Sequence, residues 1–263
     1  MATASAYSGE LTEEMIEAAR AELIETDGEP LETPWHRAAI NLLIEVLLWH
    51  WRGRTDFFVG GNMFIWYSRT QRREGEYKGP DFFFVDHVDG TRKRLYWWAF
   101  EEDNRLPDVI VELSSPTTMK EDHTSKKDLY ERTFKMPEYY CYDPDTRTLE
   151  GWRLGADHRY HAIEPNERGW LWSEQLQLWL GTWEGRYLEA QECWLRFYDA
   201  SGQMLPCKAE ESDFRAKQEA ARAEQEAARA EQEAARADAL TEEVARLKAK
   251  LVAKESSEGD GQS

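Results

Sequence analysis

A strand with a carboxylate in its middle is the feature of this sequence that most restricts its fold. Residues 109–113 hold three β-branched residues and a leucine around Glu112, and a run of this kind favours a buried strand. A charged carboxylate in such surroundings is costly unless something neutralises it. A bound cation is one answer, so this strand predicts both a buried sheet and a candidate cation site.

Asp81 is the acid that can share this cation. It follows Pro80 at the head of another apolar stretch, residues 81–85. Neighbouring strands lie about 4.8 Å apart, so Asp81 can lie opposite Glu112 if the two strands pair. Asp108 points to the same side of its strand as Glu112, but about 13 Å separates them, and we assign Asp108 to the turn before the strand. The expected metal pair is therefore Asp81 with Glu112.

The remaining pattern predicts an α/β sheet with a β-rich C-terminal extension. Apolar periodicity predicts helices at 10–27 and at 122–134. Another helix starts at Pro34, with Thr33 as its N-cap and an apolar face over residues 40–48. β-Branched and aromatic runs between turn signals predict further strands at 56–59, 62–67, 138–142, 149–154, 160–163, 170–172 and 194–198.

From Lys217 the chain becomes a seven-residue alanine repeat. The sequence Gln-Glu-Ala-Ala-Arg-Ala-Glu occurs at 218–224 and again at 225–231, and its alanines have the three-and-four spacing of a coiled-coil seam. The seam slips between Ala237 and Leu240, which weakens one continuous coil, and alanine buries little apolar area. A homodimeric coiled coil through these heptads and a single solvated helix both remain open. The expected segments are an N-terminal helical segment 1–32, a folded domain 33–207, a heptad helix 208–254 and a disordered tail 255–263.

Charge and cysteine content restrict the partners and the compartment. The formal net charge is −18, so the overall field repels nucleic acid, and a contact with DNA needs a local basic patch or bound cations. Three widely spaced cysteines fit neither a disulfide framework nor a metal knuckle. With no signal peptide or membrane-spanning run in the sequence, we expect a cytoplasmic protein. The basic residues whose simplest interpretation is solvated loop charges, and whose arginines could alternatively form the local patch, are Arg69, Arg72, Arg73, Lys78, Arg92, Lys93 and Arg94.

Several of these features occur together, in order and at fitting intervals, as in one known family. The segments that carry the pattern are residues 79–81, 107–118, 126–130 and 136–144. From about residue 33 to about residue 205 the chain resembles the Uma-type (Uma two) family of bacterial restriction-endonuclease-like proteins. The resemblance implies the PD-(D/E)XK nuclease fold, which is a central mixed sheet flanked by helices. It also implies dependence on Mg²⁺, with Mn²⁺ as an alternative, and DNA as the substrate.

The resemblance also assigns roles to individual residues. Asp81 and Glu112 take the places of the motif aspartate and glutamate, hold the metal ion, and form the catalytic set together with Lys126. Ser114 stands two residues after the glutamate, where the parent motif has its lysine. The resemblance therefore moves the role of the lysine to Lys126 in the following helix, with Lys127 as the next candidate. Activity then requires that Lys126 reach the side of the sheet on which Glu112 lies.

Other residues have simpler interpretations, and one functional alternative stays open. His36 lies on the first turn of its helix and is expected to be a surface or capping histidine, although this helix can approach the metal in the implied fold class. Tyr130, Tyr139 and Tyr140 are expected to be core aromatics. The whole chain is interpreted as a Mg²⁺-dependent DNA endonuclease, or alternatively as a catalytically inactive interaction or assembly module that oligomerises through its helical tail.

Overall fold

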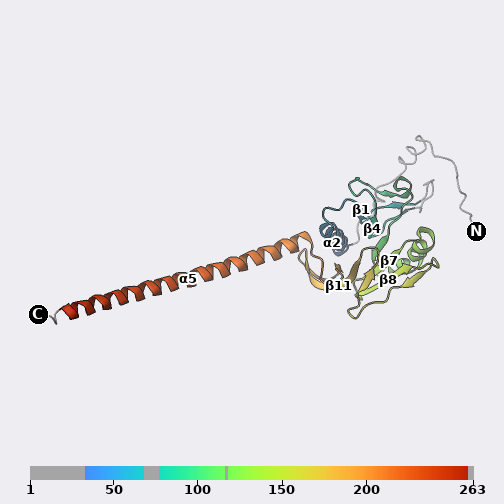
Figure 1. Ribbon diagram of the computed structural model, residues 1–263. Helices are drawn as coiled ribbons and strands as arrows, with labels where there is room; N and C mark the ends of the chain where they lie inside the picture. Colours follow the sequence, from blue (N-terminus) through green and yellow to red (C-terminus); the bar gives the residue numbers. More distant parts are fainter. Residues whose placement is uncertain (1–32, 68–76, 116–117, 260–263) are drawn as a thin grey trace, which may run out of the picture. The chain divides into compact units, whose positions relative to one another are not determined.

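The computed structural model describes residues 33–67, 77–115 and 118–259, and Figure 1 shows the course of its elements. Contacts divide the chain into two compact units, Met1–Lys208 and Ala209–Ser263, one residue away from the boundary expected from the sequence. The predicted helix at 10–27 lies outside the described residues, as do Arg69, Arg72 and Arg73. In the ranges that are described, no helix combines the length and the apolar character required to cross a membrane.

A six-stranded mixed sheet forms the centre of the first unit, in the order β1-β4-β6-β7-β8-β9. Strands β6 and β7 run parallel, and the other neighbouring pairs are antiparallel. A parallel pair needs a crossover connection, which the helical segment between β6 and β7 supplies. The α/β architecture with a mixed sheet is thus confirmed. The strands are β1 (Phe57–Gly60), β4 (Phe82–Asp86), β6 (Val109–Leu113), β7 (Glu138–Asp143), β8 (Thr148–Leu154) and β9 (Tyr160–Ala162).

Two three-stranded sheets accompany the central one. The first contains β3 (Tyr77–Lys78), β2 (Ile65–Trp66) and β5 (Trp97–Trp98), with the short helix η1 (Ala99–Glu102) after β5. The second is the antiparallel set β10 (Leu171–Ser173), β11 (Leu178–Tyr187) and β12 (Ala190–Tyr198). Strand β2 is shorter than the predicted strand at 62–67, and β12 starts four residues before the predicted 194.

Strand β11 was not predicted, because two glycines interrupt its apolar pattern. A Cβ atom on Gly181 would lie 2.3 Å from the Trp170 ring, and one on Gly185 would lie 1.9 Å from the Trp183 ring. Glycine in a strand often marks such a close approach. The two glycines that interrupt the apolar pattern of this strand are therefore the residues that make room for the tryptophan rings.

Helix α2 (Pro34–His50) begins as its sequence predicts. Pro34 is the first helical residue, and the Thr33 hydroxyl oxygen accepts a hydrogen bond from the His36 backbone N–H at 3.1 Å. This satisfies one of the backbone donors that a helix start leaves unpaired. The buried face packs into one core cluster of the first unit and consists of Ala39, Ile40, Leu42, Leu43, Val46 and Leu47.

Substitution of the cap tests how much this helix start contributes. Thr33→Ala is expected to lower the free energy of unfolding by about 1 kcal/mol, because the His36 N–H loses its partner. Thr33→Ser keeps the hydroxyl and should stay close to wild type. Urea denaturation followed by tryptophan fluorescence measures the difference, and equal stabilities of the Ala and Ser variants would contradict the capping role.

The crossover between β6 and β7 is helical from residue 119 to residue 134, three residues longer at its start than predicted. It comprises α3 (Met119–Glu121), η2 (Asp122–Lys126), α4 (Lys127–Leu129) and η3 (Tyr130–Phe134), of which η2 and η3 are π-helical turns. Such turns inside helices are rare and occur often at functional sites. Residues four apart lie on one side of a helix, so Asp122, Lys126 and Tyr130 share a side.

The two faces of the central sheet bury different clusters. Val109, Val111 and Leu113 pack in the cluster that contains the buried face of α2. Ile110, between them, packs instead in the cluster that contains Tyr130 of the crossover segment. This alternation is the period of two that a strand imposes.

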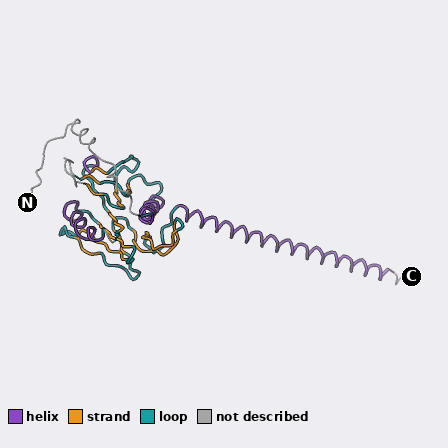
Figure 2. The backbone as a smooth tube through the Cα atoms, turned by 180° about the vertical axis from the view of Figure 1, so that it is seen from behind, coloured by secondary structure: helices purple, strands orange, loops and turns teal. Residues whose placement is uncertain are grey.

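The second unit is dominated by one helix, α5 (Lys208–Gly259), of 52 residues, drawn as the long purple helix in Figure 2. It extends five residues beyond the predicted end at 254, so residues 255–259, expected to be disordered, are helical. Residues 212–227 of α5 are all exposed.

Candidate active site

The two acids of the expected metal pair lie side by side on neighbouring strands. Strands β4 and β6 pair with Phe82 opposite Val111, and Asp81 immediately precedes Phe82 while Glu112 immediately follows Val111. The Leu113 backbone N–H donates to Asp81 Oδ2 at 2.7 Å. This hydrogen bond fixes the Asp81 carboxylate beside β6.

Both acids belong to the face of the sheet that the crossover segment covers. Side chains alternate along a strand, so Asp81 shares its side with Phe83, and Glu112 shares its side with Ile110. Phe83 and Ile110 both pack in the cluster that contains Tyr130. The sequence expectation that these two acids converge from adjacent strands therefore agrees with the geometry.

Lys126 reaches this face from the crossover segment. Its Nζ atom lies 3.1 Å from Glu112 Oε2 and 2.8 Å from Asp122 Oδ1. The side chains of Glu112 and Asp122 are 1% and 2% exposed, and that of Lys126 is 17% exposed. The ammonium group is thus held between two buried carboxylates, and the geometric condition for its predicted role is met.

Asp122 is a site residue that sequence reasoning missed. Its Oδ2 atom accepts a hydrogen bond from the Ser114 hydroxyl at 2.9 Å, while Oδ1 pairs with Lys126. Ser114 occupies the position of the motif lysine. Its hydroxyl group is hydrogen-bonded to Asp122, and Asp122 in turn pairs with Lys126 of the next element. The spacing of four between Asp122 and Lys126 is the sequence signal that could have indicated this pair.

Two buried tyrosines complete the hydrogen bonding. The Tyr130 hydroxyl donates to Glu112 Oε1 at 3.0 Å, and the Tyr139 hydroxyl donates to the Asp122 backbone oxygen at 2.9 Å. Both rings are fully buried, as expected of core aromatics. Their hydroxyl groups also orient the cluster, which the sequence did not indicate.

His36 is not the surface or capping histidine that we expected. Its Nε2 atom lies 2.8 Å from Asp81 Oδ1, and its side chain is only 12% exposed. The cap of α2 is Thr33, and the first turn of the helix places His36 against the head of β4. The Asp81 carboxylate therefore contacts the Leu113 N–H through one oxygen and His36 through the other.

The cluster brings three carboxylates and one lysine into a buried space. Burial raises the pKa of Glu112 to about 8; Lys126 opposes this shift, whereas Asp81 and Asp122 reinforce it. Burial on its own lowers the pKa of Lys126, but the negative charges of Glu112 and Asp122 outweigh burial and raise the pKa above its ordinary value. An additional cation would relieve the repulsion between the acids.

We define the carboxylate cluster as Asp81, Glu112, Asp122 and Lys126; its three acids have the donor chemistry of a site for a hard divalent cation. Its ligand atoms are carboxylate oxygens, which Mg²⁺ and Ca²⁺ prefer. Burial is the largest cause of the raised pKa of Glu112, and the negative charges of Asp81 and Asp122 add to it. The cluster thus offers the ligand chemistry of a metal site, with Lys126 already neutralising part of its negative charge.

Among the residues that the structure describes, the only group of three potential ligands whose ligand atoms all lie within 4.8 Å of one another is a different one, Asp56, Asp86 and His87. Here, as in the carboxylate cluster, a positive charge is already present. The Arg54 guanidinium pairs with Asp56 Oδ1 and with Asp86 Oδ1, each at 2.8 Å. Asp56 is 57% exposed, so the charges of this group are screened by water, unlike those of the carboxylate cluster.

Comparison with known families decides the relationship. The family described as "Uma2: Putative restriction endonuclease" matches residues 10–188. The chain belongs to the Uma2 family. The matched range contains the whole carboxylate cluster and excludes α5.

Other comparisons add little to this. Among solved structures, the Uma2 chain is similar to one described as "a putative nuclease belonging to DUF820" from Anabaena variabilis. The identity is 14%, the TM-score is 0.40, and the match covers 58% of this chain and 81% of that one. No protein with a curated description matches the chain.

In this Uma2 protein, Asp108 and Lys127 both contact partners outside the carboxylate cluster. Asp108 Oδ2 accepts the Asp86 backbone N–H at 2.8 Å and pairs with Arg105 at 3.2 Å, which agrees with a role at the strand entry. Lys127 Nζ lies 3.7 Å from the centre of the Trp152 ring, so its ammonium group is engaged there. Its neighbour Lys126 is the lysine that contacts Glu112.

The predicted basic surface is largely neutralised where it is described. Arg92 and Arg94 both pair with Glu102, and Lys78 pairs with Glu121 at 3.3 Å. Ion pairs of this kind reduce the net positive potential that a phosphate backbone would meet. These residues therefore give little support to a preformed basic surface.

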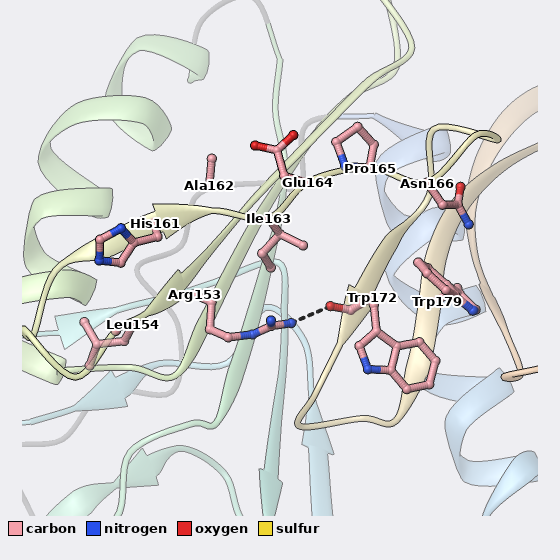
Figure 3. A pocket seen from close by; sticks show the side chains of 11 residues that line it. Arg153, Leu154, His161, Ala162, Ile163, Glu164, Pro165, Asn166, Trp172 and Trp179 are labelled. Carbon is pink, nitrogen blue, oxygen red and sulfur yellow. Dashed lines mark hydrogen bonds between the residues drawn. The ribbon is translucent and has the colours of Figure 1, made fainter.

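Two cavities are lined by no residue of the carboxylate cluster. One of about 550 Å³ is lined by His123 and Thr124 of the crossover segment and by Cys141, the register partner of Glu112. Another, of about 390 Å³, lies among β8, β9, β10 and β11, and none of its lining residues belongs to the carboxylate cluster. Figure 3 shows Arg153 in this second cavity, where its Nη2 atom donates to the Trp172 backbone oxygen at 2.7 Å.

Proposed function

We propose that the Uma2 domain of this protein is a metal-dependent endodeoxyribonuclease that hydrolyses phosphodiester bonds in DNA. The observation that carries the proposal is the meeting of Asp81, Glu112 and Lys126 on one buried face of the sheet. Three separate elements supply these residues, and their position matches the order that the family pattern implies. Membership of the Uma2 family supports the same reaction class.

Asp81 and Glu112 would hold the metal ion, with Mg²⁺ as the expected ion and Mn²⁺ as a substitute. When bound there, a divalent ion supplies a Lewis acid and lowers the pKa of a water molecule. Lys126 would supply a fixed positive charge beside the reacting phosphate, where it stabilises the charge that develops in the transition state.

The neighbours of these three residues hold them in place. Asp122, fixed by Ser114, positions the Lys126 ammonium, and Tyr130 orients the Glu112 carboxylate through its hydroxyl group. His36 holds Asp81 from the side of α2. A supporting set of hydrogen bonds is what keeps reacting groups in a productive geometry.

DNA as the partner has to be reconciled with a net charge of −18. Much of this charge lies outside residues 33–207, because residues 1–32 contain nine acids and one arginine, whereas the acids of α5 are largely balanced by its basic residues. At the cluster itself a divalent ion would add two positive charges at the place where a phosphate has to approach. We therefore expect binding of DNA to depend strongly on the metal.

A plasmid-nicking assay tests this function, with two aspartates compared. The wild-type protein should nick supercoiled DNA in Mg²⁺ or Mn²⁺ and should be inactive in EDTA. Asp81→Asn should reduce the rate at least about 100-fold, because the ion loses one of its carboxylates. Asp56→Asn, in the exposed group paired with Arg54, should cleave like wild type. Loss of activity in the Asp56 variant alone would contradict the proposed site and indicate that the metal binds at Asp56, Asp86 and His87. Unchanged activity in both variants would contradict the proposal as a whole.

A further inference from the structure

Helix α5 combines an acidic part and a basic part. Residues 219–243 contain eight acids and three arginines, whereas residues 246–254 contain four basic residues and no acid. Every one of these charged residues whose side chain the structure describes is exposed, Glu231, Glu233 and Lys248 among them. A single solvated helix has no need of such segregation, and opposite charges at the two ends of one stretch are suited to antiparallel pairing.

The residues at the seam positions of α5 also change in size along the helix. Its first half presents alanine at every seam position from Ala220 to Ala237, and its second half continues with Leu240, Val244, Leu247 and Leu251. Large residues pack best when small residues face them. Two copies in opposite directions would bring the large half of each helix against the small half of the other.

We propose that α5 pairs with α5 of a second copy as an antiparallel coiled coil, in the register that puts Leu251 level with Ala230. The same register puts Leu247 level with Ala234 and Val244 level with Ala237. The twofold axis then passes between residues 240 and 241, where the seam slips. The register slip of the seam, which would disturb a continuous coil, therefore lies at the axis of symmetry. Each contact occurs twice, as an isologous interface requires.

The charges beside the seam select the same arrangement. In this register Glu231 lies beside Lys248 of the second copy on one flank of the seam, and Glu233 lies beside Lys250 on the other flank. Such flanking charges set partner choice and orientation in coiled coils. A parallel pair in register would instead bring Glu219 against Glu224 and Glu226 against Glu231, and like charges would repel along the alanine half.

Charge reversal in the full-length protein tests the pairing. Wild type should sediment as a dimer at tens of micromolar in low salt. Glu231→Lys with Glu233→Lys should raise the dissociation constant about tenfold or more, because attraction becomes repulsion on both flanks. Adding Lys248→Glu and Lys250→Glu to that variant should restore the dimer. A monomeric wild type, or a combined variant no tighter than the first, would overturn the proposal.

Single cysteines distinguish the two orientations. Leu240→Cys lies next to the proposed axis and should form a disulfide-linked dimer on mild oxidation. Ala223→Cys, also on the seam, would lie about 50 Å from its counterpart in the antiparallel pair and should stay unlinked. Wild type is the control for the three native cysteines. Efficient linkage through residue 223 would establish a parallel pair and overturn the antiparallel register.

Discussion

Glu112→Gln is expected to abolish metal-dependent cleavage and, at the same time, to make the metal-free protein more stable at pH 8.5. Loss of cleavage of at least about 1000-fold follows if Glu112 is a metal ligand, because an amide cannot replace the charge of the carboxylate. The gain in stability follows because burial raises the pKa of Glu112 to about 8 in the folded state. Ionisation of Glu112 therefore lowers the free energy of unfolding of the wild-type protein.

The direction of this pH effect follows from proton linkage. Between the ordinary glutamate pKa of 4.5 and the folded value of about 8, the folded protein binds more protons than the unfolded chain. The free energy of unfolding of wild type therefore falls as the pH rises through this window. The variant lacks this term, so its advantage should be absent near pH 4.5 and reach about 1–3 kcal/mol at pH 8.5, since loss of the Lys126 pair offsets part of the gain.

Urea denaturation in EDTA at pH 5 and at pH 8.5 measures the difference. Glu121→Gln is the matched control, because Glu121 is 51% exposed on the same crossover segment. It should cleave DNA like wild type and show the same pH dependence of stability. A Glu112 variant that is less stable than wild type at pH 8.5 would contradict the buried-charge account.

The central features of the site were predictable because they depend on local periodicity. Strand alternation and the short distance between neighbouring strands place Asp81 opposite Glu112 if β4 and β6 pair, and the structure supplies that pairing. Strand β6 has the residues that its apolar run predicts. Lys126 was identified as a site residue only through the family resemblance. Its spacing from Glu112 says nothing about the direction in which the crossover helix presents it.

What the sequence did not reveal depends on contacts between distant elements. His36 and Asp81 meet because α2 packs across the head of β4, and no pattern within either segment indicates this contact. Asp122 resembles any acid in the first turns of a helix until the Ser114 hydroxyl is found beside it. The π-helical turns that align Asp122, Lys126 and Tyr130 have no recognisable sequence signal.

Lys126→Met is expected to produce the largest combined loss of cleavage activity and folding stability. Cleavage should fall about 100-fold or more, because the positive charge beside the reacting phosphate disappears. The free energy of unfolding at pH 8.5 should fall by about 3 kcal/mol, because Glu112 and Asp122 remain buried without their shared cation. At pH 5 most of that stability should return, since Glu112 then takes up a proton in the folded state.

Lys127→Met separates this effect from the loss of any lysine in the segment. Lys127 lies over the Trp152 ring, so its removal should cost only about 0.5–1 kcal/mol, with no dependence on the protonation of Glu112 and no loss of cleavage. The double variant Lys126→Met with Glu112→Gln should be more stable at pH 8.5 than Lys126→Met alone, because the second change removes the uncompensated charge. The gain from Glu112→Gln should be larger in the Lys126→Met variant than in wild type, because Lys126 no longer offsets the buried charge; equal gains in both backgrounds would show that the two side chains are not coupled. The ion pair at the centre of the proposed site would then be energetically irrelevant.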